Sequence, residues 1–166
     1  MGDVKNLTGA EAAAKIKELA EEINTCMFCN YVNGKLISRP MSSTKADDNG
    51  DIWFLSDKNS AKNHELAADN EVELLFSQGQ SKFLQVHGRS SIGFDKEKIK
   101  ELWNPAAKIW FTEGVDDPRI SVIKVSVEDG YYWDTKHGKA VEIVIMAAAF
   151  ISGKTMDDGI EGTLSK

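Results

Sequence analysis

A chain of 166 residues, 42% of them hydrophobic, is long enough to bury one core and too short to suggest two. Its net charge of -6 argues against a nucleic-acid-binding surface, which needs clustered lysine and arginine side chains. No stretch approaches the apolar length of a membrane span, and the N-terminus lacks the basic and apolar regions of a signal peptide. We therefore expect one soluble, cytoplasmic domain with no membrane or nucleic-acid partner.

The first predicted element is an amphipathic helix over about residues 9 to 24. The stretch Leu7-Thr8-Gly9-Ala10-Glu11 has the pattern of a capping box, in which a threonine and a glutamate bond free backbone amides at the start of a helix. Apolar residues then recur at helical spacing, at Ala12, Ile16, Leu19 and Ile23. This face of the helix should be buried.

Three β-rich runs follow the helix. They cover Cys26 to Val32, Lys35 to Thr44 and Ile52 to Ser56, and they are joined at Asn33-Gly34 and Asp48-Asn49-Gly50. Asn-Gly between such runs is the strongest short signal for a β-hairpin. The pattern therefore predicts an antiparallel meander.

The two cysteines, Cys26 and Cys29, have the C-x-x-C spacing of thioredoxin-like redox pairs and of zinc sites. Both lie in a predicted strand, however, where residues three apart point to opposite faces and lie roughly 10 Å apart along the chain. Such thiols could neither pair nor share a metal ion. We interpret them as buried and unreactive.

The rest of the chain is predicted to alternate short helices with strands. Ser60 to Ala68 is expected to be a helix with Ser60 as its N-cap. Strands over Val72 to Phe76 and Phe83 to Ile92, a helix from Phe94-Asp95 to Asn104-Pro105, and long strands over Ile120 to Trp133 and Val141 to Ile151 follow. The stretch from Gly153 to Lys166 is expected to be mobile or docked on a partner subunit. Six or seven antiparallel strands with intervening helices predict a small barrel of the α+β class.

A lysine stands in an unfavourable place at the start of the second predicted helix. Lys62 follows the Ser60 cap by two residues, where free amides and the positive end of the helix dipole favour acidic side chains. A bound anion would reverse this preference, because helix N-termini are natural phosphate sites. The Ser60 hydroxyl, the backbone amides and the Lys62 ammonium would then form a phosphate cradle. The alternative is that Lys62 simply points into solvent.

The stretch Arg39-Pro40-Met41 is a second candidate site. Pro40 has no N–H to donate to a ladder and therefore marks an edge strand or a bulge. Backbone at an edge is free to meet a ligand, and the guanidinium of Arg39 can make paired hydrogen bonds to a phosphate or a carbonyl oxygen. The alternative is an exposed arginine on an edge strand.

Motifs of other enzyme classes are absent from the sequence. It contains no dinucleotide-binding, P-loop, zinc-peptidase or nucleophile-elbow motif. The three histidines, His64, His87 and His137, are scattered and lack acidic neighbours at ligand spacing, so no metal site is expected. No residue stands out as a catalytic acid or base.

Taken together, these segments resemble the FMN-binding elements of the pyridoxamine 5'-phosphate oxidase-like family, and more closely its general stress protein branch. The resemblance covers roughly residues 10 to 150 and rests on Arg39-Pro40-Met41, Trp53-Phe54-Leu55-Ser56 with Ser60 and Lys62, Leu102-Trp103-Asn104-Pro105, Trp110-Phe111, Asp116-Asp117-Pro118 and Tyr132-Trp133. It implies a mostly antiparallel, six- or seven-stranded split β-barrel with flanking helices over residues 1–152, followed by a C-terminal tail over 153–166. It also implies FMN as the cofactor.

The resemblance further implies a set of cofactor-binding residues, namely Arg39, Pro40, Met41, Leu55, Ser56, Ser60, Lys62 and Trp133. Met41 and Leu55-Ser56 would lie along the isoalloxazine ring, through backbone and short side-chain contacts. In this family the flavin lies at a two-fold dimer interface, so Trp133 would reach the cofactor of the neighbouring subunit. The alternative for Trp133 is ordinary core packing.

The sequence departs from the oxidase pattern at several positions. Ser56 replaces a threonine, Ala61 replaces an arginine and Thr44 replaces a lysine, so phosphate binding would involve fewer charges. Lys139 and Val141 stand where the oxidase carries an arginine and a histidine that hold its substrate. We therefore do not expect oxidation of pyridoxamine 5'-phosphate.

Three functions are compatible with this pattern. The first is an FMN-dependent oxidoreductase that acts on an unknown small substrate in a stress response. The second is a non-catalytic flavin-binding or flavin-buffering stress protein. The third is a split barrel that binds another ligand, such as haem or a deazaflavin, because a fold does not determine a function.

Overall fold

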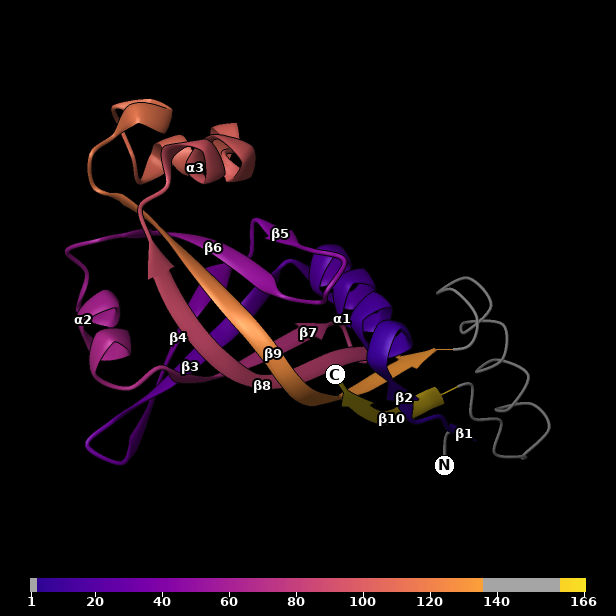
Figure 1. Cartoon of the computed structure of the whole chain (residues 1–166). Coiled ribbons are helices and arrows are strands. Elements are labelled where there is room, and N and C mark those ends of the chain that lie inside the picture. The colour runs from indigo at the N-terminus through magenta and orange to yellow at the C-terminus, as the bar shows by residue number, and fades with distance from the viewer. Residues whose placement is uncertain (1–2, 136–158) are drawn as a thin grey trace.

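The structure is a computed structural model, and it describes residues 3–135 and 159–166 (Figure 1). In these ranges the strands are β1 (Asp3–Val4), β2 (Leu7–Thr8), β3 (Thr25–Val32), β4 (Lys35–Ser42), β5 (Lys45–Ala46), β6 (Ile52–Asp57), β7 (Glu71–Gln78), β8 (Lys82–Gly93), β9 (Ile120–Thr135) and β10 (Gly159–Ser165). The helices are α1 (Gly9–Ile23), α2 (Ala61–Ala68) and α3 (Lys96–Leu102), with short 3-10 helices η1 (Pro105–Ile109) and η2 (Gly114–Asp116). The predicted strand over Val141 to Ile151 lies outside the described residues.

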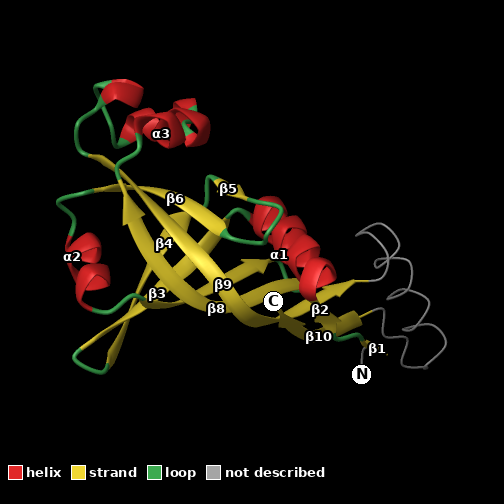
Figure 2. Ribbon diagram, viewed as in Figure 1, coloured by secondary structure: helices red, strands yellow, loops and turns green. Residues whose placement is uncertain are grey.

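The strands form one curled, mostly antiparallel sheet (Figure 2). Its order is β1-β10-β9-β8-β7-β3-β4, and β6 joins it by pairing with the first half of β9. In the described residues β4 pairs only with β3, while β6 pairs with β9 and the short β5, so the sheet stays open between β4 and β6. The structure confirms the predicted α+β class and the split barrel.

The main core lies inside the curled sheet, under α1. Ile16 and Leu19 on α1 are fully buried there, as the helical spacing predicts. Phe28 and Phe54, from β3 and β6, meet edge to face with their ring centres 5.4 Å apart. β3 carries the edge strand β4, so this contact across the core holds the two sides of the open barrel together.

The predicted capping box does not form at the start of α1. Thr8 occupies the N-cap position, but its side chain makes no capping hydrogen bond. Thr8 belongs to β2, where it pairs with Ser165 of β10. The strand pairing therefore fixes the start of α1 in place of the local side-chain cap.

The C-terminal residues depart from the expected tail. Gly159–Ser165 form β10, which pairs antiparallel with β9 and parallel with β1 and β2. An added Cβ on Gly162 would overlap the carbonyl oxygen of Lys5, so only glycine allows the N-terminal segment to cross there. The expectation of a mobile or partner-docked tail is wrong for these residues, because Leu164 is buried in the main core of the same chain.

A third helix and the two 3-10 helices form a separate lobe between β8 and β9, at one end of the sheet (Figure 1). A second apolar cluster holds this lobe to the sheet and includes Ile99, Leu102 and Phe111 of the lobe with Val122 of β9. Asp95 caps α3 through its carboxylate, as the helix start at Phe94-Asp95 predicts. Among the helices of the described residues, none has the length and apolar character needed to cross a membrane.

Close contact between β8 and β9 depends on glycine. At Gly88 the register of the two strands shifts, and an added Cβ would overlap the carbonyl oxygen of Ser126. Because the overlap is with the backbone of β9, which cannot rotate away as a side chain can, a side chain at Gly88 would push the strands apart. Gly93, at the end of the same strand, has open space at the corresponding position.

We predict that Gly88→Ala lowers the free energy of unfolding by about 1–3 kcal/mol, the usual cost of forcing extra volume into a packed site. Gly93→Ala is the matched control and should leave stability unchanged within about 1 kcal/mol. Urea denaturation of both variants measures the difference. Equal stability of the two variants would contradict the close approach of β8 and β9 at Gly88.

Candidate functional site

The two segments predicted to bind an anion meet at the open side of the barrel. Arg39 points from β4 towards α2, where its Nη2 donates a 2.7 Å hydrogen bond to Oε2 of Glu65. The Nδ2 atom of Asn30 donates to the same carboxylate oxygen at 3.0 Å. Arg39 is therefore half-buried and fixed in place, and the alternative of an exposed edge arginine is wrong. The prediction that Pro40 lies on an edge strand is confirmed, within the described residues, by the position of β4.

The start of α2 forms as predicted. Ser60 is the N-cap, and its Oγ accepts a hydrogen bond from the backbone amide of Asn63 at 3.3 Å. Lys62 lies in the first turn and is half-buried, with no hydrogen-bond or ion-pair partner among residues 3–135 and 159–166. The alternative that Lys62 points freely into solvent is therefore wrong.

The surroundings of Lys62 disfavour the charged form of its side chain. Burial lowers the pKa of Lys62 to about 8, and the neighbouring positive charge of Arg39 adds to this effect. Glu65 lies three residues further along α2 and acts in the opposite direction, but its carboxylate is already bonded to Arg39 and Asn30. Asp57 acts in the same direction as Glu65 but more weakly. The two cations thus share a partly desolvated space with two carboxylates, neither of which pairs with Lys62 among the described residues.

Two buried polar atoms in the same place lack partners. Within the described residues neither Nη1 of Arg39 nor Oδ1 of Asn30 has a hydrogen-bond partner. An unmade hydrogen bond of a buried polar group costs about 1–3 kcal/mol, and more when the group is charged. An anion beside Arg39 and Lys62 would satisfy Nη1 and relieve the repulsion between the two cations. Arg39, Ser60 and Lys62 are called the cationic cradle below, and their chemistry fits a phosphate group.

A closed hydrogen-bond network holds the cradle in place. Oγ of Ser56 donates to Oδ1 of Asn63 at 2.8 Å, and Nδ2 of Asn63 donates to Oγ of Ser121 at 2.8 Å. Oγ of Ser121 in turn donates to the carbonyl oxygen of Ser56 at 2.9 Å. Ser56, a predicted cofactor residue, thus has its hydroxyl committed to the protein. Sequence reasoning missed Asn63, and the only signal was a polar residue in the first helical turn, three residues after the cap.

The side chains of Met41 and Leu55 do not meet. Met41 packs at the edge of the main core, whereas Leu55 packs beside Trp53 against the second apolar cluster. The two residues lie on β4 and β6, the strands that border the open side of the barrel. Contact of both residues with one flavin ring, through their backbones, stays a prediction.

Trp133 lies on the outside of the sheet. Its side chain is 40% exposed, which rules out ordinary core packing. It contacts the ring of Tyr131, with ring centres 4.6 Å apart, and that of Phe83, at 6.4 Å. Ser121, beside the cradle, is near the start of β9 and Trp133 is near its end, about 40 Å further along the strand at 3.3 Å per residue. Figure 1 shows α2 and the end of β9 on opposite sides of the molecule.

The outer face of the sheet is apolar around Trp133. Cross-strand neighbours Pro40, Met27, Leu75, Gln85 and Tyr131 form a row over β4, β3, β7, β8 and β9. Met27 and Leu75 are 39% and 40% exposed, unusually open for large apolar side chains. Large exposed apolar surface on a soluble protein marks a site of association.

The remaining candidate residues are placed as follows. Cys26 and Cys29 are both buried and unpaired, as expected, and burial raises the pKa of the Cys26 thiol to about 12. His87 contacts Glu71 through its Nε2 at 3.0 Å. The part of the chain that the structure describes contains no group of three or more metal-ligating side chains arranged to hold an ion. His137, Lys139 and Val141 lie outside the described residues.

Comparison with known proteins agrees with this arrangement. The family model for pyridoxamine 5'-phosphate oxidase like proteins matches residues 11–157. The chain belongs to the pyridoxamine 5'-phosphate oxidase-like family. Among curated proteins, bli-3 of Neurospora crassa is 27% identical over 131 residues. That match covers 73% of this chain and 63% of the Neurospora protein, so the chain spans less than two thirds of its relative.

Several solved structures share the fold. A putative general stress protein 26 from Jannaschia sp. CCS1 is 25% identical, with a TM-score of 0.78 over 95% of this chain and 99% of that one. General stress protein 26 of Bacillus anthracis is 23% identical, with a TM-score of 0.66 over 72% and 92% of the two chains. The general stress FMN/FAD binding protein of Xanthomonas citri is 23% identical, with a TM-score of 0.65 over 76% and 90%.

Proposed function

We propose that this protein binds FMN, with the phosphate of the flavin in the cationic cradle. The observation that carries the proposal is that, among the described residues, Nη1 of Arg39 and the half-buried ammonium of the neighbouring Lys62 both lack a partner. Two such cations, close to the N-terminus of the capped helix α2, favour the binding of an anion with several acceptor oxygens. The choice of flavin is supported by the family and by the similar fold of the general stress FMN/FAD binding protein from Xanthomonas citri.

Each residue of the cradle has a distinct task in this proposal. Arg39 donates through Nη1, which has no partner in the described part of the chain, while Glu65 keeps the guanidinium in position through Nη2. Lys62 supplies a second charge, and the Ser60 cap keeps the first turn of α2 open towards the ligand. The backbones of Met41 and Leu55 border the opening in which the ring would lie. A bound flavin would supply the electron or hydride transfer, and the chain would hold and orient it.

We further propose a homodimer in which the outer face of one chain covers the flavin of the other. The row around Met27 and Leu75 supplies the apolar surface, and Trp133 supplies an exposed aromatic ring. Trp133 lies too far along β9 to reach the cradle of its own chain, so it would complete the site of a partner. In a two-fold dimer this exchange occurs twice.

The reaction that fits best is an oxidation or reduction of a small substrate in a stress response. The proposal excludes pyridoxamine 5'-phosphate, because Lys139 and Val141 replace the arginine and histidine with which the oxidase holds it. A lysine keeps the positive charge but lacks the paired N–H donors of the arginine guanidinium, and valine can neither donate nor accept a proton. In this proposal the substrate reacts at the flavin itself.

We predict that Lys62→Ala weakens FMN binding by about 1.5–3 kcal/mol, the range for a hydrogen bond to a charged group, and leaves riboflavin binding nearly unchanged. Lys58→Ala is the control, because Lys58 is an exposed lysine four residues earlier in the chain. Fluorescence titration with both flavins measures the difference. Equal loss for FMN and riboflavin would show that Lys62 acts through the fold, and no loss for FMN would remove the cradle from the proposal.

We also predict that FMN binding weakens between pH 8 and pH 9, by up to about tenfold. The phosphate raises the pKa of Lys62 above its free value of about 8, so binding is strongest below pH 8 and falls as the free lysine loses its proton. A phosphate monoester is already dianionic above pH 7 and does not contribute to this change. Titrations of the Lys62→Ala variant should be flat over the same range, and a parallel decline in that variant would refute the assignment.

A further inference from the structure

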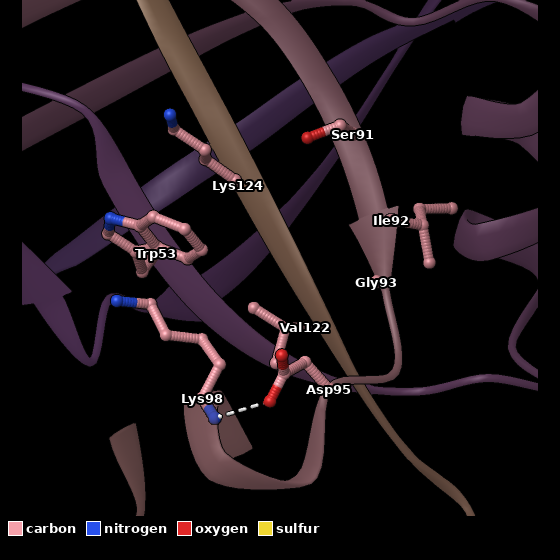
Figure 3. Close-up of a pocket in the computed structure, with 8 residues that line it drawn as sticks. All are labelled: Trp53, Ser91, Ile92, Gly93, Asp95, Lys98, Val122 and Lys124. Atoms are coloured by element: carbon pink, nitrogen blue, oxygen red, sulfur yellow. Dashed lines mark hydrogen bonds between the residues drawn. The ribbon is translucent and has the colours of Figure 1, made fainter. Parts of the chain in front are cut away.

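A cavity lies on the outer side of the sheet, under α3 (Figure 3). Its volume is about 310 Å³, within the range of small-molecule sites. Trp53, Lys124 and Ser91 form its floor as cross-strand neighbours on β6, β9 and β8. Asp95 and Lys98 come from the start of α3. None of these residues belongs to the cationic cradle.

Two lysines flank the indole ring of Trp53. The Nζ of Lys98 is 4.1 Å from the centre of the ring, and that of Lys124 is 5.3 Å away. Figure 3 shows the ring between the two ammonium groups. The Nε1 of Trp53 donates a hydrogen bond to Oδ2 of Asp47 at 3.0 Å, and this bond fixes the orientation of the indole ring. The indole therefore holds two positive charges at the wall of one cavity.

The acidic partners of these lysines are shared. Glu101 bonds Lys98 at 2.9 Å and Lys45 at 2.6 Å. Asp51 pairs with Lys124 at 2.9 Å and also with Lys166. Asp47, which accepts the hydrogen bond of the indole, is a third carboxylate beside these lysines. Among the charged residues that line the cavity itself, two are lysines and one is an acid, so its wall carries one net positive charge.

One acidic group opposes this excess. Oδ1 of Asp95 accepts hydrogen bonds from the backbone amides of Glu97 and Lys98, so this carboxylate is engaged in capping α3. Its charge still lies at the cavity wall (Figure 3). Removing that charge should strengthen an anion site and would weaken a cation site, which makes Asp95 a test of the sign of the ligand.

We propose that this cavity binds a small organic anion that carries more than one acidic group. Such a molecule can meet Lys98 and Lys124 together, one on each side of the indole, and accept a hydrogen bond from the Ser91 hydroxyl. Carboxylates and phosphate esters share this chemistry. The site is separate from the cradle and does not depend on flavin binding.

The test follows the indole N–H signal of Trp53 in ¹H–¹⁵N spectra of the full chain during titration with citrate and, separately, with pyrophosphate. The protein has four tryptophans, and Trp53→Phe identifies the signal. We expect a saturable shift with at least one of the two anions. Tighter binding of citrate would indicate a carboxylate ligand, and tighter binding of pyrophosphate a phosphate ester.

Variants decide whether the shift reports this cavity. Lys98→Ala and Lys124→Ala should each weaken binding by about tenfold, whereas Lys100→Ala, on the exposed side of α3, should not. Asp95→Asn keeps a good helix cap and should tighten binding. Lys62→Ala should have no effect, which separates this site from the cradle. Absence of a saturable shift with either anion, or equal weakening by Lys100→Ala, would overturn the proposal.

Discussion

The hydrogen-bond network of Ser56, Asn63 and Ser121 is the constraint on which the candidate site depends. It joins β6, the first turn of α2 and β9 through three contacts of 2.8–2.9 Å in a buried place. A helix of eight residues is too short to be stable alone, so its direction must come from tertiary contacts. Because Asn63 fixes the start of α2, Ser60 and Lys62 are held opposite Arg39 across the opening of the barrel.

The arrangement that results is unfavourable without a ligand. Arg39 and Lys62 repel each other where water is partly excluded, and one guanidinium nitrogen has no partner in the described part of the chain. Glu65 offsets some of this cost but serves mainly to orient Arg39. The cavity under α3 differs in this respect, because each of its lysines is already paired with a carboxylate. The cradle is thus the site with the stronger demand for an anion.

Local patterns predicted those parts of the molecule that local interactions determine. The spacing of Ile16 and Leu19 predicted α1, and Asn33-Gly34 predicted the hairpin between β3 and β4. Ser60 was identified as a cap because its hydroxyl acts within three residues of its own position. The two halves of the cradle were also predicted, but only the fold could bring Arg39 and Lys62 together.

Elements that depend on distant partners were missed. β10 has few large apolar residues, and β1 and β2 have two residues each. These strands form because β1 and β2 each pair with β10, which in turn pairs with β9. The same pairing displaced the capping box expected at Thr8. The buried role of Asn63 could not be read from the sequence, since its partner Ser121 lies 58 residues away.

The central claim is that the cradle of one chain and Trp133 of another form a single flavin site. Lys62→Ala and Trp133→Ala chains, carrying different affinity tags, can be co-expressed and purified as heterodimers. Each variant homodimer should bind FMN weakly, whereas about half of the sites in the heterodimer should bind with the affinity of the unaltered protein, because one site then has both residues intact. Calorimetric titration counts these sites. If every site in the heterodimer stays weak, or if Trp133→Ala alone binds FMN normally, the claim is contradicted.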